Sequence, residues 1–102
     1  MEFSGFDWDR GNRTKCQKHG VSVAEIESLF HRPLMVAPDL AHSSREERFK
    51  AVGTTDAGRH VFIAFTLRRR GQGTLIRPVS ARYMHRKEIE SYEEENPDLP
   101  ER

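Results

Sequence analysis

Residues Val61-Phe62-Ile63-Ala64-Phe65 form the longest apolar run in this chain. A run of this length is too short for a typical helix and is typical of a central β-strand that is covered on both faces. His60 precedes the run and Leu67 closes it. We therefore expect residues 60–67 to form the inner strand of a sheet.

Shorter strands are expected on both sides of this run. Residues 48–53 alternate with the period of two that a half-buried strand shows, and residues 3–8 and 34–37 are predicted as short strands, the second ended by Pro38. Residues 68–73 are predicted to form a basic, glycine-containing hairpin loop. A strand over residues 74–80 follows, in which Pro78 requires an edge or a bulge.

The clearest helix begins at Ser22-Val23-Ala24-Glu25, which has the spacing of a capping box. Val21 and Ile26 stand at the positions of a hydrophobic staple, and the apolar stripe that follows predicts a helix over residues 23–30. Residues 10–19 and 84–95 are also helix-compatible. The predicted fold class is α+β: a small antiparallel sheet of about four strands, with an N-terminal strand and helix pair before it and a C-terminal helix after it.

Length and composition predict one domain over residues 1–102, with a polar C-terminal tail over residues 96–102. Cys16 is the only cysteine, which excludes an internal disulfide and favours a reducing compartment. No apolar run approaches the roughly 20 residues of a membrane span. We expect a cytoplasmic protein with no membrane partner. Because Cys16-Gln17-Lys18-His19 has no second ligand pair, we expect no metal, and no motif predicts a cofactor.

The charges are strongly segregated along the chain. Residues 59–87 contain eight basic side chains and no acidic one, whereas the segment from Glu88 onward is predominantly acidic. The basic residues are Arg59, Arg68, Arg69, Arg70, Arg77, Arg82, Arg86 and Lys87. Guanidinium groups without local carboxylates are expected to be free for phosphate, which indicates nucleic acid or an acidic partner protein. Arg68, Arg69 and Arg70 taken alone fit a solvated hairpin equally well.

An ordered set of short motifs resembles the family of BrnT-type toxins. The set begins with Phe6-Asp7-Trp8-Asp9, Gly11-Asn12, Lys15-Cys16 and Lys18-His19-Gly20-Val21-Ser22. It continues with Glu25-Ile26-Glu27, Leu29-Phe30, His42, Glu46-Glu47-Arg48, Arg77, Ser80-Ala81-Arg82, Glu88 and Tyr92. The chain differs from the family pattern at Pro78, where an apolar strand residue is usual.

This resemblance implies a RelE-like fold and the activity of an endoribonuclease. Members of the family are toxins of type II toxin–antitoxin modules that cleave RNA, inhibit translation and are neutralised by a cognate antitoxin protein. The implied partners are therefore an antitoxin and an RNA substrate, with operator DNA bound only through the antitoxin.

Metal-independent cleavage by 2′-OH attack requires proton transfer and stabilisation of the pentacoordinate phosphate. The candidates for binding the scissile phosphate are Arg48, Arg77 and Arg82, because a guanidinium binds phosphate bidentately. The candidate proton carriers are His19, His42 and Glu47, with Lys18 adding charge beside His19. Arg68, Arg69 and Arg70 are candidates for binding the RNA backbone, and Tyr83 is a candidate for stacking on a base.

Two other classes of protein fit the same residues. A non-catalytic nucleic-acid-binding module uses the arginines for phosphate and needs no proton carrier. An interaction protein uses the basic face to receive an acidic partner, such as an antitoxin. Cleavage of RNA, as opposed to binding alone, separates the enzyme from both alternatives.

Overall fold

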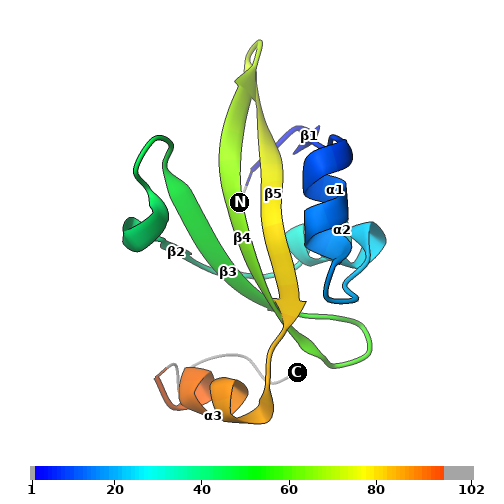
Figure 1. The fold of residues 1–102 in the computed structure, drawn as a ribbon, viewed down its shortest axis with the longest axis vertical. Helices are drawn as coiled ribbons and strands as arrows, with labels where there is room; N and C mark the ends of the chain where they lie inside the picture. Colours follow the sequence, from blue (N-terminus) through cyan, green and yellow to red (C-terminus); the bar gives the residue numbers. More distant parts are fainter. Residues whose placement is uncertain (1, 96–102) are drawn as a thin grey trace.

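The computed structural model describes residues 2–95, so the predicted tail over residues 96–102 lies outside the described part of the chain. The elements are β1 (Gly5–Phe6), α1 (Arg10–Gln17), α2 (Val23–Phe30), β2 (Met35–Pro38), the short 3-10 helix η1 (Leu40–His42), β3 (Arg48–Thr54), β4 (His60–Arg70), β5 (Gly73–Tyr83) and α3 (Arg86–Glu95). The α+β class is confirmed (Figure 1). None of the described helices is long and apolar enough to cross a membrane.

The five strands form one sheet in the order β1-β5-β4-β3-β2. Strands β2 to β5 pair antiparallel, as expected, and β4 is the central strand. The N-terminal strand corrects the expectation of a purely antiparallel sheet, because β1 pairs parallel to β5. No hairpin joins β1 to β5, so nothing in the connection forces the two strands to run in opposite directions.

The hairpin between β4 and β5 has longer strands and a shorter loop than expected. Arg68, Arg69 and Arg70 belong to β4, and Arg70 pairs with Gly73, so the loop consists of Gly71 and Gln72 alone. Gly71 has a φ of +59°, which favours glycine in such a turn. The prediction of a loop over residues 68–73 was therefore wrong, because arginine residues at a strand end continue the ladder when the partner strand is long enough.

The bulge predicted for Pro78 is confirmed. Ala64 pairs with Ser80 whereas Phe65 pairs with Pro78, so the register shifts by one residue at this point. The side chain of Pro78 is fully buried, and its carbonyl accepts a hydrogen bond from Asn12 Nδ2 at 2.8 Å. A bulge accommodates a residue that has no N–H to donate to the ladder. The strand predicted over residues 34–37 was expected to stop before Pro38. In the structure Pro38 is instead the last residue of the edge strand β2.

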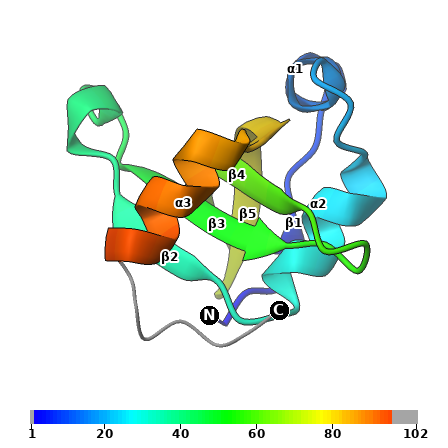
Figure 2. The same cartoon turned by 90° about the horizontal axis from the view of Figure 1, so that it is seen from below.

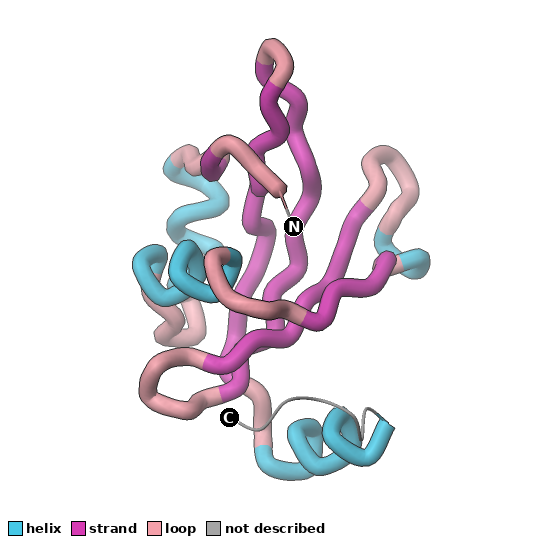
Figure 3. Tube along the Cα trace, turned by 180° about the vertical axis from the view of Figure 1, so that it is seen from behind, coloured by secondary structure: helices cyan, strands magenta, loops and turns pink. Residues whose placement is uncertain are grey.

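The hydrophobic core lies between α2 and one face of the sheet. Figure 3, seen from behind, shows α2 in front of the strands. Ile26 and Leu29 of α2 and Ile63 and Phe65 of β4 are all completely buried. The capping box is confirmed, because Ser22 Oγ accepts from the Glu25 amide at 3.0 Å and the Ser22 amide donates to Glu25 Oε1 at 3.1 Å.

The opposite face of the sheet is flanked by α1 beside β5 and is covered at one end by α3 (Figure 2). This helix has no buried residue. It is held by ion pairing between Arg82 and Glu88 and by an edge contact between the rings of Tyr92 and His60.

Candidate active site

A groove of about 320 Å³ lies on the sheet face that α2 does not cover. Its walls come from α1 on one side and from the segment that enters β3 on the other. The lining residues are Gly11, Asn12, Lys15, Glu46, Arg48, Thr66, Arg68, Arg77 and Val79.

The floor of the groove is a row of three side chains across neighbouring strands. Arg48 of β3 pairs with Thr66 of β4, and Thr66 pairs with Arg77 of β5. Directly paired residues project from the same face of a sheet, with Cβ atoms roughly 4.5–5.5 Å apart. The three side chains therefore lie side by side, with the threonine between two arginines.

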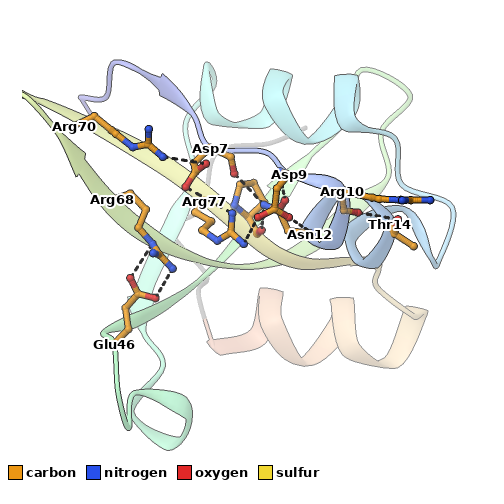
Figure 4. A network of polar contacts seen from close by, with 10 residues as sticks. Asp7, Asp9, Arg10, Asn12, Thr14, Glu46, Arg68, Arg70 and Arg77 are labelled. Carbon is orange, nitrogen blue, oxygen red and sulfur yellow. Dashed lines mark hydrogen bonds and ion pairs between the residues drawn. The ribbon is translucent and has the colours of Figure 1, made fainter.

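Arg77 is anchored by two aspartates from the N-terminal segment (Figure 4). Its guanidinium nitrogens lie 2.8 Å from Asp9 Oδ2 and 3.6 Å from Asp7 Oδ2. Asp9 is also the N-cap of α1, where its carboxylate accepts from the Asn12 amide at 3.0 Å. The hydrogen bond from the Asn12 amide, followed by that from Arg77, lowers the pKa of Asp9 below its ordinary value. The same carboxylate thus starts a helix and orients an arginine.

Two further arginines of the second face are also paired. Arg68 lies 3.0 Å from Glu46 Oε2, and Arg70 lies 3.9 Å from Asp7 Oδ1 (Figure 4). The expectation that the basic segment has no carboxylate partners was therefore wrong. The partners come from distant segments of the chain, which a reading of local charge does not detect.

Arg48 and Lys15 differ from these arginines, because neither forms an ion pair with any residue between 2 and 95. The backbone of Arg48 is nevertheless fixed. Its amide donates to Ser43 Oγ at 2.9 Å, and its carbonyl accepts from the Asp39 amide at 2.8 Å. The groove therefore holds a positioned arginine whose charge is uncompensated in the described part of the protein.

Arg82 lies on the same face of the sheet but does not line the groove. Its two terminal nitrogens each donate to a Glu88 oxygen at 2.7 Å, and its guanidinium carbon lies 5.0 Å from the centre of the Phe62 ring. The hydrogen bonds from Arg82 lower the pKa of Glu88 to about 2. This bidentate pair attaches α3 to the end of the sheet.

None of the expected proton carriers lines the groove. Lys18 and His19 are exposed in the turn after α1. Nδ1 of His42 lies 3.0 Å from Asp39 Oδ2 in the connection between β2 and β3, and the exposed Glu47 directly precedes Arg48. Among the described residues that line the groove, Glu46 is the single carboxylate.

The expected RNA-contacting residues are divided between surfaces. Arg68 and Arg70 share the face of the groove, whereas strand alternation directs Arg69 to the other side of β4. The Tyr83 hydroxyl donates to Glu25 Oε1 at 2.9 Å, and the guanidinium of Arg59 lies 3.5 Å from the centre of the Tyr83 ring. One side of that ring is therefore already covered.

The sequence reading missed Asp7, Asp9, Lys15, Glu46 and Thr66 as residues of this site. Asp7 and Asp9 belong to the motif that resembles the toxin family, but their pairing with Arg77 depends on β1 lying against β5. Thr66 directly follows the apolar run of residues 61–65, and its neighbours in the sequence do not indicate a site residue. Only the register of three strands places it between two arginines.

A second, larger hollow of about 850 Å³ is open to solvent beside Phe3, Phe30 and the β4–β5 turn. His31 and Arg32 line this hollow, but the described residues that line it include no arginines on paired strands like those of the groove. No three metal-binding side chains gather in residues 2–95. Cys16 is completely buried, and this burial raises the pKa of its thiol to about 11, so it serves as a small core residue. The groove is therefore the candidate active site.

Comparison with known proteins identifies a family for this chain. A family described as the ribonuclease toxin, BrnT, of type II toxin–antitoxin systems matches residues 8–88. The match includes all residues that line the groove. A comparison with curated proteins gave no match.

Proposed function

The chain belongs to the BrnT family of ribonuclease toxins of type II toxin–antitoxin systems, and we propose that it cleaves RNA in the groove between α1 and β3. One observation carries this location. Arg48 of β3 and Arg77 of β5 line the same groove on either side of β4, and Arg48 has no carboxylate partner within residues 2–95. An RNA phosphate supplies the negative charge that this arrangement lacks.

In this proposal the ribose 2′-oxygen loses its proton and attacks the adjacent phosphorus, and the bond from phosphorus to the 5′-oxygen breaks. The products are a 2′,3′-cyclic phosphate and a 5′-hydroxyl, whose oxygen takes up a proton. Arg48 and Arg77 bind the non-bridging oxygens and stabilise the charge that develops on the pentacoordinate phosphate. Two guanidinium groups supply this stabilisation without a metal ion. Cleavage of RNA then inhibits translation, and the α+β architecture is consistent with a RelE-like fold.

Glu46 is the proton acceptor that the groove favours. It is paired with Arg68, and an incoming phosphate competes for that arginine and releases the carboxylate. Glu47, His42 and His19, with Lys18 beside it, stay candidates, although none of them lines the groove. A single-turnover comparison of Glu46→Gln, Glu47→Gln, His42→Ala and His19→Ala identifies the carrier, since only its loss lowers the rate and changes the pH profile.

The second part of the proposal concerns the partner. A cognate antitoxin covers the basic face and excludes RNA, and operator DNA binds through the antitoxin alone. The arginines of this face, including Arg82 once its pair with Glu88 opens, provide charge for an acidic segment. Antitoxin binding that is not weakened by the combined changes Arg68→Glu, Arg77→Glu and Arg82→Glu contradicts this surface.

Incubation of the purified protein with RNA in EDTA tests the activity. The proposal expects cleavage of RNA and retention, without cleavage, of an oligonucleotide in which every 2′-OH is methylated. Binding of both without cleavage of either indicates the non-catalytic module instead. Cleavage of the methylated oligonucleotide contradicts the 2′-OH mechanism.

A further inference from the structure

Thr66, near the middle of β4, buries a hydroxyl that the protein leaves unsatisfied. The residue is 4% exposed, and Oγ1 has no hydrogen-bond partner within the described residues. Buried polar groups are nearly always hydrogen-bonded. A polar group that is buried without a partner has lost its hydrogen bonds to water, and this loss of hydration costs free energy that nothing offsets. A threonine in this state requires an explanation other than packing, since valine has the same shape without the hydroxyl.

The position of Thr66 supplies the explanation. It lines the groove, and its direct neighbours on the adjoining strands are Arg48 and Arg77. A group that enters between these two guanidiniums lies against Thr66 on the floor. Because Arg48 and Arg77 are positively charged, we expect that group to be an anion.

We propose that Thr66 is a substrate-binding residue whose hydroxyl donates a hydrogen bond to a non-bridging oxygen of the RNA phosphate held by Arg48 and Arg77. This inference rests on the proposed function, RNA cleavage in the groove. A phosphate fits between these three side chains because its oxygens accept several hydrogen bonds at once, including those from the guanidinium groups of Arg48 and Arg77. In the complex with RNA the Thr66 hydroxyl then has a hydrogen-bond partner, which it lacks among the described residues of the free protein.

The arginines beside Thr66 are held in a way that suits this role. Arg77 is only 21% exposed and is anchored by Asp7 and Asp9. The backbone of Arg48 is fixed by Ser43 and Asp39. A hydroxyl on the central strand is equally rigid, so the phosphate contacts are arranged before the substrate arrives.

The test compares three variants in binding and in stability. Thr66→Val removes the hydroxyl at constant shape, Thr66→Ser retains it, and Thr54→Val removes the hydroxyl of a β3 threonine that does not line the groove. The probe is a short RNA oligonucleotide methylated at every 2′-OH, and its affinity is measured by fluorescence anisotropy. We expect Thr66→Val to weaken binding roughly tenfold, which corresponds to about 1.4 kcal/mol. Thr66→Ser and Thr54→Val are expected to bind as the wild type does.

Thermal unfolding of the same variants separates binding from structure. Thr66→Val is expected to unfold at the same or a higher temperature, because it removes an unsatisfied buried hydroxyl. A marked fall in its unfolding temperature, or weak binding by Thr66→Ser, overturns the inference.

Failure of the inference is distinguishable from failure of the proposed function. If Arg48→Ala weakens binding of the methylated oligonucleotide and Thr66→Val does not, the groove stands and the role of Thr66 is overturned. If neither change weakens binding, both the groove and the role of Thr66 are overturned.

Discussion

Arg77 and Arg48 lie in the same groove but are held in different ways. Arg77 is held by carboxylates, whereas Arg48 is positioned through its backbone and retains an uncompensated charge. An anchored guanidinium loses less freedom when it binds a phosphate, because its planar fork already points in one direction. We infer that Asp9 acts on the reaction through Arg77, as a positioning residue.

Two substitutions of Asp9 separate its two tasks. Asp9→Asn keeps an oxygen that caps α1 but removes the negative charge beside Arg77, so we expect an unchanged unfolding temperature and cleavage slower by about tenfold to a hundredfold. Asp9→Ala also removes the cap, and its unfolding temperature is expected to fall. Thermal unfolding and single-turnover cleavage of both variants provide the measurement. A rate above that of the wild type for Asp9→Asn means that Asp9 competes with the phosphate instead of positioning Arg77.

At the scale of single elements, α2 depends on its first turn. Ser22→Ala is expected to lower the free energy of unfolding by roughly 1 kcal/mol, because the Glu25 amide loses its acceptor. The denaturation midpoint measures the loss, with Ser44→Ala in the exposed loop before β3 as the control. Equal midpoints for the two variants contradict the importance of this cap.

The elements that the sequence predicted well are those specified by neighbouring residues. The capping box at Ser22 and the irregularity at Pro78, predicted as an edge or a bulge and observed as a bulge, each depend on a few consecutive side chains. The groove depends on long-range pairing instead. The row of Arg48, Thr66 and Arg77 exists only after three strands have paired in one register, so the sequence gives no local sign of it.

The last helix, α3, offers a test by pH. Arg82 lowers the pKa of Glu88 from its ordinary value of 4.5 to about 2, so the pair contributes fully above pH 4.5 and is lost as the pH falls toward 2. NMR titration of the Glu88 carboxyl carbon is expected to show this low pKa. In Arg82→Gln it is expected to return toward the ordinary value. A Glu88 that titrates near 4.5 with Arg82 present means that the pair is not formed in solution.

At the scale of the whole molecule, the sheet uses its two faces differently. One face packs on α2 and provides the stability (Figure 3), and the other presents the groove. Alternation along β4 accomplishes this division, because Ile63 and Phe65 point into the core while Thr66 points into the groove. The central strand therefore connects folding to the proposed activity.

The same alternation predicts unequal effects of two neighbouring core substitutions. Ile63 is completely buried, whereas Phe62 is partly exposed beneath the Arg82 guanidinium. Ile63→Ala is expected to lower the free energy of unfolding by about 2–5 kcal/mol, and Phe62→Ala by less. Chemical denaturation of the two variants measures the difference. Losses of equal size mean that both faces of β4 are buried to the same extent.

The central claim is that this groove cleaves RNA, and the cleavage rate of Arg48→Lys tests it most directly. Lysine keeps the charge but not the bidentate fork, so we predict a rate several hundredfold lower in EDTA, equivalent to about 3–4 kcal/mol of transition-state stabilisation. Lys50→Ala, which removes an exposed charge two residues further along β3, is the control and is expected to retain the wild-type rate. Full cleavage by a folded Arg48→Lys variant contradicts the account.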